Sequence, residues 1–403
     1  MVKSMTDSSN QHSATEPGAT SMRRLNTQKV LKATWDRGLV TASELIELTS
    51  LTRATVLNQA KELVATGWLR EAEDTRAAGA YSKGRPALRY ELDAAKSVVA
   101  GIDAGQHRIS LALADLRGKE IERRSLSVEP GACGEERLRI TEELLRGTLE
   151  KHGVQKLGAL VIGVPAPVDS GGFSPKVADG FWAAMNPDWR AQLAEYTHLF
   201  SVENDANLAA VAELGLEESD SFAALMVGER FGAGVVIDGH LLRGTHGLAG
   251  EMRFLSHVTG VGDALGLGYL AREQARHALA GGAESSLRRI PAELVRAEDV
   301  FQAAAQQDPL ALEILESLGR RLAKVVAVIS GFAGLQKVIL SGAMAGILQP
   351  VIDIADRELA REPELTCVQL AVSELGAEVA LQGAISRGIE LVRATAPFET
   401  QNR

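Results

Sequence analysis

One stretch in the first third of the chain, GRPALRYELDAAKSVVAGIDAG (residues 84–105), separates two kinds of sequence pattern. The residues before it show short amphipathic helices divided by turns, whereas those after it alternate between strand and helix patterns. The stretch itself predicts an alternating strand over residues 87–92 and then a buried strand that ends at an Asp-x-Gly turn. The junction therefore divides the chain into different domains, and a length of 403 residues allows two or three.

Charge and cysteine content narrow the function classes. Residues 1–92 hold 13 Lys and Arg against 10 Asp and Glu, whereas the remainder holds 30 against 42. A basic head is suited to an anionic partner such as DNA, but ordinary variation in charge explains the difference equally well. Cys133 and Cys367 lack the paired spacing of a zinc cluster or of a secreted disulfide scaffold.

The chain ends and the hydropathy predict a cytoplasmic protein. No apolar run reaches about 20 residues, the length of a membrane span. The polar N-terminus has no apolar signal core, so we expect no membrane attachment. Residues 1–22 and 396–403 are polar and predicted to form disordered tails.

Residues 23–92 predict three helices followed by a two-stranded hairpin. The first helix stops at Gly38, the second is capped by Thr41 or Ser43, and the third is capped by Thr52. Two strand patterns follow, with a loop between them. This succession is typical of a winged helix-turn-helix DNA-binding domain.

The third helix and the loop after it carry the candidate DNA-binding residues. Arg, Asn and Gln side chains can bond base edges in the major groove, and a helix N-terminus attracts phosphate. An arginine between Gly and Pro, on a stiff extended backbone, fits the minor groove. The candidates are Thr52, Arg53, Thr55, Asn58 and Gln59 in the helix, and Lys83 and Arg85 in the loop. A small helical domain with a solvated polar face is the alternative.

The body of the chain, residues 97–395, consists of two similar α/β halves. Each half opens with strands joined by glycine turns and continues into helices. The first lobe is expected over residues 97–215 together with the last helix, and the second over residues 216–375. Two such halves predict a two-lobed α/β fold with a cleft between the lobes.

Five motifs of the body carry a family resemblance: GIDAG, GVPAPVD, VENDANLAAVAE, DGHLLRGTHGLAGE and VILSGAMAG. Their order and approximate spacing resemble the ROK family (repressor, open reading frame, kinase), and the resemblance covers residues 23–395. It implies the actin-like ATPase fold of sugar kinases for the body. The winged head in front resembles the repressor branch of the family, whose members sense sugars or sugar phosphates.

The chain departs from this family at the phosphate loops and at the zinc module. The kinases carry Asp-x-Gly-x-Thr where this chain has residues 103–107, and a glycine-rich loop where it has residues 228–232. Phosphate needs close backbone N–H groups and hydroxyl donors, so a carboxylate at Glu229 predicts that ATP binding and kinase activity are lost. Phe254 stands in place of the family's zinc-binding His, and the cysteines that follow are missing. We therefore expect no catalytic residue, no metal and no cofactor.

The sugar site that the resemblance implies is kept in part. Asn204, Asp205 and Glu251 match the family's hydroxyl-binding positions, and His246 is a fourth candidate for ligand binding. In the kinases the residue matching Asp205 is the general base; here we expect it to contact a ligand. An N-cap for the helix that begins at Ala206 is its alternative role.

The leading hypothesis is a ligand-responsive DNA-binding transcriptional regulator, a repressor of carbohydrate-metabolism genes. It would bind a palindromic operator as a homodimer or homotetramer and respond to a sugar or a sugar phosphate. One alternative is a ROK sugar kinase with a regulatory DNA-binding head. Another is a DNA-bound scaffold whose cleft is empty and unresponsive.

Overall fold

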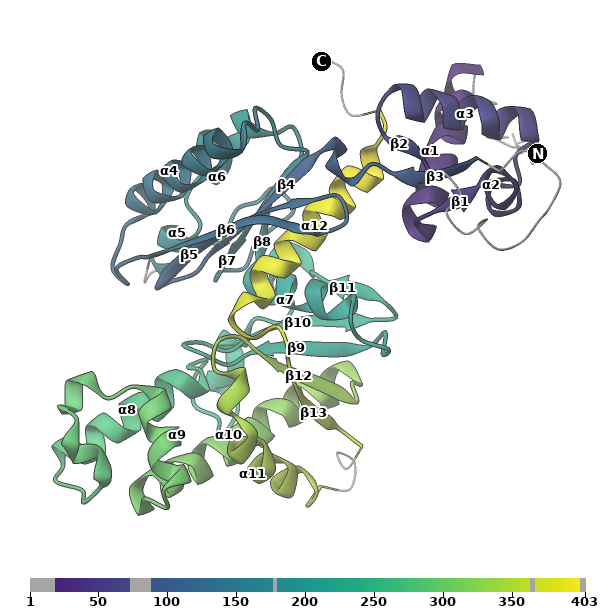
Figure 1. Ribbon diagram of the computed structural model, residues 1–403. Helices are drawn as coiled ribbons and strands as arrows, with labels where there is room; N and C mark the ends of the chain where they lie inside the picture. Colours follow the sequence, from purple (N-terminus) through teal and green to yellow (C-terminus); the bar gives the residue numbers. More distant parts are fainter. Residues whose placement is uncertain (1–18, 73–87, 177–179, 363–366, 399–403) are drawn as a thin grey trace, which may run out of the picture. The chain divides into compact units, whose positions relative to one another are not determined.

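The computed structural model describes residues 19–72, 88–176, 180–362 and 367–398 (Figure 1). The chain folds as two compact units. One consists of Met1–Lys96 with Arg393–Arg403, and the other of Ser97–Val392. Among the described residues, no helix combines the length and the apolar character needed to cross a membrane.

The first unit packs three helices against a small antiparallel sheet with the strand order β1-β3-β2. Trp35 and Trp68 meet in its core, with ring centroids 6.5 Å apart. The helices are α1 (Ala19–Arg37), α2 (Ala42–Thr49) and α3 (Arg53–Ala65), and the strands are β1 (Val40–Thr41), β2 (Leu69–Ala72) and β3 (Arg89–Leu92).

Side-chain caps start the second and third helices of this unit. The Thr41 hydroxyl accepts from the backbone N–H of Glu44, whose carboxylate accepts from the backbone N–H of Thr41 at 2.6 Å. The Thr52 hydroxyl accepts from the backbone N–H of Thr55 at the start of α3. Each cap satisfies helix N–H groups that have no partner within the helix. The predicted caps at Thr41 and Thr52 are confirmed.

The ends of the chain differ from the prediction of disorder. Helix α1 begins at Ala19, so the last part of the predicted tail over residues 1–22 is helical; residues 1–18 lie outside the described residues. At the other end Ala396 is buried, and the Arg24 guanidinium stacks on the Phe398 ring at 4.9 Å. The first part of the predicted tail over residues 396–403 therefore packs within the first unit. Strand β1 was not predicted.

The second unit contains two five-stranded sheets with the same topology. In each sheet three consecutive strands form an antiparallel meander. The fourth strand pairs in parallel with the first, and the fifth strand lies next to the fourth. The resulting strand orders are β6-β5-β4-β7-β8 and β11-β10-β9-β12-β13. The first sheet contains β4 (Val98–Ala104), β5 (Arg108–Asp115), β6 (Glu120–Ser127), β7 (Ala159–Val164) and β8 (Phe200–Asn204). The second contains β9 (Phe222–Met226), β10 (Gly232–Ile237), β11 (His240–Leu242), β12 (Lys337–Ser341) and β13 (Gln369–Val372).

Helices cover these sheets and bury two apolar cores. One core joins the first sheet to α4 and the short helices after β7, and the larger one joins the second sheet to α8–α11. The helices are α4 (Gly134–His152), α5 (Phe181–Met185), α6 (Trp189–Leu193), α7 (Asp205–Leu214), α8 (Leu267–Ala280), α9 (Ala297–Ala305), α10 (Pro309–Ala333), α11 (Gln349–Leu359) and α12 (Val379–Thr395).

Helix α7 is held by unusually close backbone contacts. A Cβ at Gly234 of β10 would lie 2.2 Å from the carbonyl oxygen of Ala206, and one at Gly383 of α12 would lie 1.9 Å from that of Leu208. Neither contact could exist with a side chain larger than hydrogen, because real Cβ atoms do not approach so closely. Glycine at these two positions therefore lets β10 and α12 fix the place of α7.

We expect Gly383→Ala to destabilise the protein by about 1–3 kcal/mol, because the added methyl must push α12 away from α7. Gly388→Ala on the same helix is the matched control, since its Cβ would make contacts no closer than 3.4 Å. Helix propensity makes the control neutral or more stable by up to about 1 kcal/mol. Urea unfolding of both variants tests this; equal midpoints for the two would contradict the packing argument.

Candidate functional site

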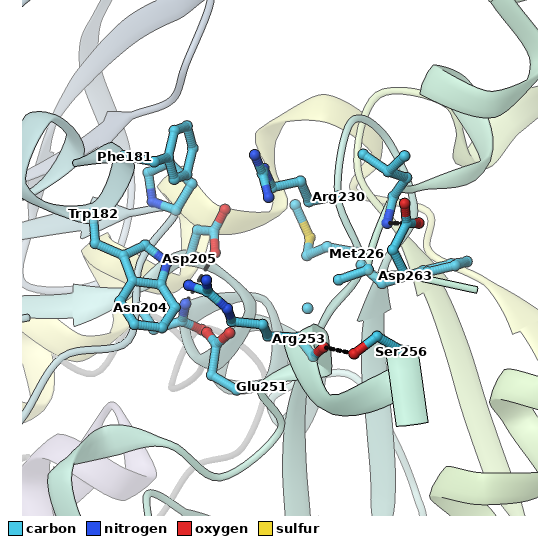
Figure 2. Close-up of a pocket in the computed structure, with 15 residues that line it drawn as sticks. Phe181, Trp182, Asn204, Asp205, Met226, Arg230, Glu251, Arg253, Ser256 and Asp263 are labelled. Carbon is cyan, nitrogen blue, oxygen red and sulfur yellow. Dashed lines mark hydrogen bonds between the residues drawn. The ribbon is translucent and has the colours of Figure 1, made fainter. Parts of the chain in front are cut away.

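A cavity of about 340 Å³ lies in the second unit (Figure 2). Its walls come from the loop after β7, α5 and the start of α7 on one side, and from the β9–β10 loop and residues 251–265 on the other. The lining residues are Pro165, Phe181, Trp182, Asn204, Asp205, Met226, Arg230, Phe231, Gly232, Glu251, Arg253, Ser256, Asp263, Ala264 and Leu265. Loops that follow two separate sheets thus share one hollow, which is the usual position for a small-molecule site.

Asn204 and Asp205 stand where β8 ends and α7 begins. The Asn204 side chain caps the helix, with its Oδ1 accepting from the backbone N–H of Asn207 at 3.0 Å and its Nδ2 donating to the carbonyl of Ala166 at 3.1 Å. Asp205 is the first helical residue, and its Oδ1 accepts from the backbone N–H of Ala206 at 2.8 Å. The alternative role considered for Asp205, that of N-cap, is wrong, because Asn204 occupies that position.

Burial raises the pKa of two carboxyl groups that line the cavity, those of Asp205 and Glu251. It raises the pKa of Asp205 to about 8, and the nearby Asp103 and Glu251 carboxylates add to this effect. Burial also raises the pKa of Glu251 to about 7, against the opposing charges of Arg230 and Arg253. A protonated carboxyl donates as well as accepts hydrogen bonds, which suits a ligand with several hydroxyl groups.

Glu251 is positioned by backbone pairing with β10. The Ala233 N–H donates to the carbonyl of Gly250 at 3.0 Å, and Gly232 and Glu251 form an antiparallel bridge. Gly250 has a φ of 79°, and a Cβ there would lie 1.7 Å from the carbonyl oxygen of Ala233. Glycine before Glu251 is therefore required for the carboxyl group to reach the cavity.

The loop over residues 228–232 is closed by protein contacts. The Glu229 carboxylate accepts from both terminal nitrogens of Arg272 on α8, at 2.8 and 3.2 Å. Burial would raise the pKa of Glu229, but Arg272 outweighs it and the pKa is lowered. Phe231 is buried, and its N–H donates to the carbonyl of Ala264 at 2.7 Å. This loop thus forms an ion pair through Glu229 and buries the ring of Phe231.

A buried arginine binds the backbone of the turn after β4. Arg137 of α4 is fully buried and donates to the carbonyl oxygens of Ala104 at 2.7 Å and Gly105 at 2.5 Å. Burial lowers the pKa of Arg137, and the Asp103 charge opposes the change. The predicted strand ended at Asp103, and the observed one ends one residue later.

The structure brings together three of the four predicted ligand-binding residues. Asn204, Asp205 and Glu251 line the same cavity, whereas His246 is exposed and is not among the lining residues. His246 sits in a short 3₁₀ turn with a φ of 62°, so its assignment to this site is corrected. The sequence analysis assigned no role in this site to Arg230 or Arg253, which also line the cavity; an arginine next to each of two glycine-containing motifs was the available signal.

The predicted DNA-binding residues of α3 differ in exposure. Thr52, Arg53 and Asn58 are exposed and Thr55 is half-buried. Gln59 is only 7% exposed and accepts a hydrogen bond from the Thr27 hydroxyl, so it ties α3 to α1 and its placement on the exposed face was wrong. The other two candidates, Lys83 and Arg85, lie outside the described residues.

The raised pKa values predict how stability changes with pH. The folded protein keeps its proton on Asp205 up to about pH 8, whereas the unfolded chain loses it near the usual pKa of about 4. The folded state therefore binds more protons in this window, and the free energy of unfolding falls as pH rises from about 4 to about 8. Asp205→Asn should make this fall smaller. The free energy of unfolding of the variant therefore increases relative to that of the wild type as pH rises.

Urea unfolding at pH 5, 6.5 and 8 measures the effect. Asp238→Asn, which changes an exposed carboxylate in the turn between β10 and β11, is the matched control and should follow the wild type. An identical pH dependence for Asp205→Asn and the wild type would show that Asp205 is ionised throughout.

Comparison with known proteins gives the family and the fold. Residues 99–387 match the model of the ROK family. The chain is 27% identical over 242 residues to a xylose repressor of Caldicellulosiruptor bescii, a match that covers 58% of this chain and 59% of the repressor, less than two thirds of its length. It is 25% identical over 267 residues to a glucokinase of Halalkalibacterium halodurans, covering 61% of this chain and 80% of the kinase.

Two solved structures share this fold. A ROK family transcriptional regulator, described as a homolog of the E. coli MLC protein, superposes with a TM-score of 0.72 at 21% identity, over 92% of this chain and 97% of that one. A ROK glucokinase from Streptomyces griseus, in complex with glucose and AMPPNP, superposes with a TM-score of 0.58 at 20% identity, over 72% and 98% of the chains. The two sheets are thus of the actin-like, sugar-kinase type, and because the family model matches most of the chain, this protein belongs to the ROK family.

Proposed function

We propose that this protein is a sugar-responsive transcriptional repressor. Its first unit would be a winged helix-turn-helix domain over residues 23–92 that binds DNA, and its second unit would be the sugar receptor. One observation supports the proposal most. A three-helix unit precedes the ROK body, and within that body the loop over residues 228–232 contains the Glu229–Arg272 ion pair. Relatives named as xylose repressors and a similar structure described as a transcriptional regulator support it.

The head has the geometry that such a domain needs. Thr52 caps α3 so that Arg53 and Asn58 stand exposed in its first two turns. These side chain types bond base edges in the major groove, while the helix N-terminus attracts a phosphate. Lys83 and Arg85 of the predicted wing would contact the minor groove. A homodimer or homotetramer would place two heads on a palindromic operator in the cytoplasm.

Two covalent connections could carry a signal between the units. One is the link between Lys96 and Ser97, and the other lies within α12, whose residues from Arg393 onward belong to the first unit. Sugar binding in the second unit would change DNA affinity by a coupling free energy of about 1–3 kcal/mol.

Selection from a random-sequence DNA duplex pool tests the DNA-binding half of the proposal, because it needs no prior operator. We expect an enriched palindromic sequence, and we expect Arg53→Ala and Asn58→Ala each to weaken binding to it by about 1–3 kcal/mol in fluorescence anisotropy. Arg289→Ala, which removes an exposed arginine from the second unit, is the matched control and should bind as the wild type. A pool with no enriched sequence at low ionic strength would overturn the proposal.

A sugar kinase with a regulatory head is the second candidate. Asp205 favours it, since a pKa raised to about 8 makes its ionised form a stronger base, and a general base with a pKa near the working pH is effective at taking a proton from a sugar hydroxyl. The Glu229–Arg272 ion pair argues against a kinase, because a carboxylate in a phosphate loop repels a triphosphate.

An assay of ADP formation with Mg-ATP and a panel of sugars separates the two candidates. We expect no sugar-dependent turnover from the wild type. Turnover at the usual kinase rate of about 1–100 per second, abolished in Asp205→Asn, would favour the kinase.

A further inference from the structure

One arginine of α10, Arg321, binds a wall of the cavity although it does not line the cavity itself. Its Nη2 donates to the carbonyl oxygens of Asp263 at 2.6 Å and Leu265 at 3.1 Å, and its Nη1 donates to that of Val261. Asp263 and Leu265 are lining residues. A single side chain outside the cavity therefore binds three carbonyl groups of one loop in its wall.

The guanidinium of Arg321 is committed to this loop. Its side chain is only 14% exposed, and the Asp263 carboxylate pairs with it at 3.2 Å. The guanidinium also stacks on the Phe231 ring at 5.6 Å. Its Nε is buried and has no hydrogen-bond partner among the described residues, so within that part of the chain its hydrogen bonds all go to residues 261–265. A buried cation needs such acceptors to offset its lost hydration.

Two glycines shape the loop for this arginine. Gly260 has a φ of 75° and Gly262 a φ of 88°, a backbone conformation that side chains larger than hydrogen disfavour. A Cβ at Gly262 would lie 2.8 Å from Nη1 of Arg321. Lys324, one turn further along α10, donates to the carbonyl of Gly260 at 3.3 Å. The loop thus turns its carbonyl groups toward the cations of α10.

The loop bound by Arg321 in turn holds Arg230, which lines the cavity. Arg230 and Leu265 form an antiparallel bridge, and the next N–H, that of Phe231, donates to the carbonyl of Ala264 at 2.7 Å. Leu265 therefore connects the two arginines, because its carbonyl accepts from Arg321 while its backbone pairs with Arg230. A shift of this loop would move Arg230 as well as the lining residues of the loop itself.

We propose that Arg321 is a positioning residue of the cavity, which sets the places of Asp263 and Arg230 by holding the carbonyl groups of residues 261–265. It touches no ligand and acts through the loop. This inference rests on the proposed function of the cavity as a sugar receptor. It adds a residue outside the cavity on which the geometry of binding depends.

The planar shape of the side chain is what the role requires. Loss of the guanidinium leaves three carbonyl groups without a donor that they share, and the cost of such unpaired groups falls on the loop. A lysine keeps the charge but lacks the fork whose two terminal nitrogens reach different carbonyl groups. Arg321 also borders a second, more open cavity of about 500 Å³ on the outer side of the loop, through which small ions can reach this position.

Hydrogen exchange followed by mass spectrometry on the full chain tests the inference without a ligand. The reporters are the N–H of Phe231 and that of Gly266, which donates to the carbonyl of Glu229 at 2.9 Å. Arg321→Ala should speed exchange in the peptides that contain them by about 10- to 100-fold, since hydrogen bonds to charged groups contribute this much. Arg320→Ala is the matched control on the same helix, because Arg320 is exposed and pairs with Glu316 instead. Unchanged exchange in Arg321→Ala overturns the inference.

Chemical rescue separates positioning from a general loss of stability. Guanidinium chloride at about 20 mM, far below the molar concentrations that unfold proteins, should restore slow exchange in Arg321→Ala by occupying the space left by the side chain. Sodium chloride at the same concentration should not. Arg321→Lys should show a smaller increase in exchange, and it replaces Arg321→Ala if that variant does not fold. An increase spread evenly over both sheets, without an effect of guanidinium, would show a merely structural role and overturn the inference.

Isothermal titration calorimetry connects the loop to binding. The probes are neutral pentoses and hexoses, among them D-xylose and D-glucose. A sugar that binds the wild type should bind Arg321→Ala at least about 10-fold more weakly and Arg320→Ala equally well. Equal affinity for Arg321→Ala and the wild type overturns the inference while the cavity remains a sugar receptor. Absence of binding by every sugar overturns the receptor role, whereas hydrogen exchange still decides whether Arg321 holds the wall.

Discussion

The close packing of α7 is the constraint on which the rest of the second unit depends. Four of the ten residues of this helix are alanines, and glycines at positions 234 and 383 let a strand and another helix approach its backbone directly. Because such contacts admit no side chain, α7 has one position between the two sheets. The start of α7, with Asn204 and Asp205, therefore lies at the cavity. The packing of the rest of the helix fixes the position of these two polar side chains.

The cavity obtains two chemical characters because the two halves contribute different parts of the repeated topology. The first half gives the loop after β7, α5 and the start of α7, and the second gives the β9–β10 loop and residues 251–265. The first half supplies Asn204, Asp205 and two aromatic rings, and the second supplies Arg230 on the loop that holds the Glu229–Arg272 ion pair and Arg253 on the turn after Glu251. The family includes kinases and repressors, and in this chain the loop contains an ion pair through Glu229 and the buried ring of Phe231.

Sequence periodicity predicted much of the fold and only part of the site. The strand expected to end at the Asp-x-Gly turn and the helix expected from Ala206 each agree within one residue with β4 and α7, because their apolar patterns are continuous. Gln59 was misplaced because α3 buries a polar pair against Thr27, and a hydrogen bond that satisfies both partners leaves no trace in hydropathy. His246 lies close to Glu251 in sequence, but a turn of positive φ directs it elsewhere. Arg253 stacks on Trp182, a residue far from it in sequence, and no local pattern encodes such a tertiary contact.

The distribution of tryptophans gives this chain a built-in optical reporter. Of its four tryptophans, Trp35 and Trp68 lie together in the first unit, and Trp189 is buried in the core of the first sheet. Trp182 forms part of the cavity wall, where the Arg253 guanidinium stacks on its ring. Indole emission depends on nearby charge and water. A molecule that enters the cavity must therefore alter the signal of Trp182 directly, so intrinsic fluorescence can follow occupancy of the receptor without any attached dye.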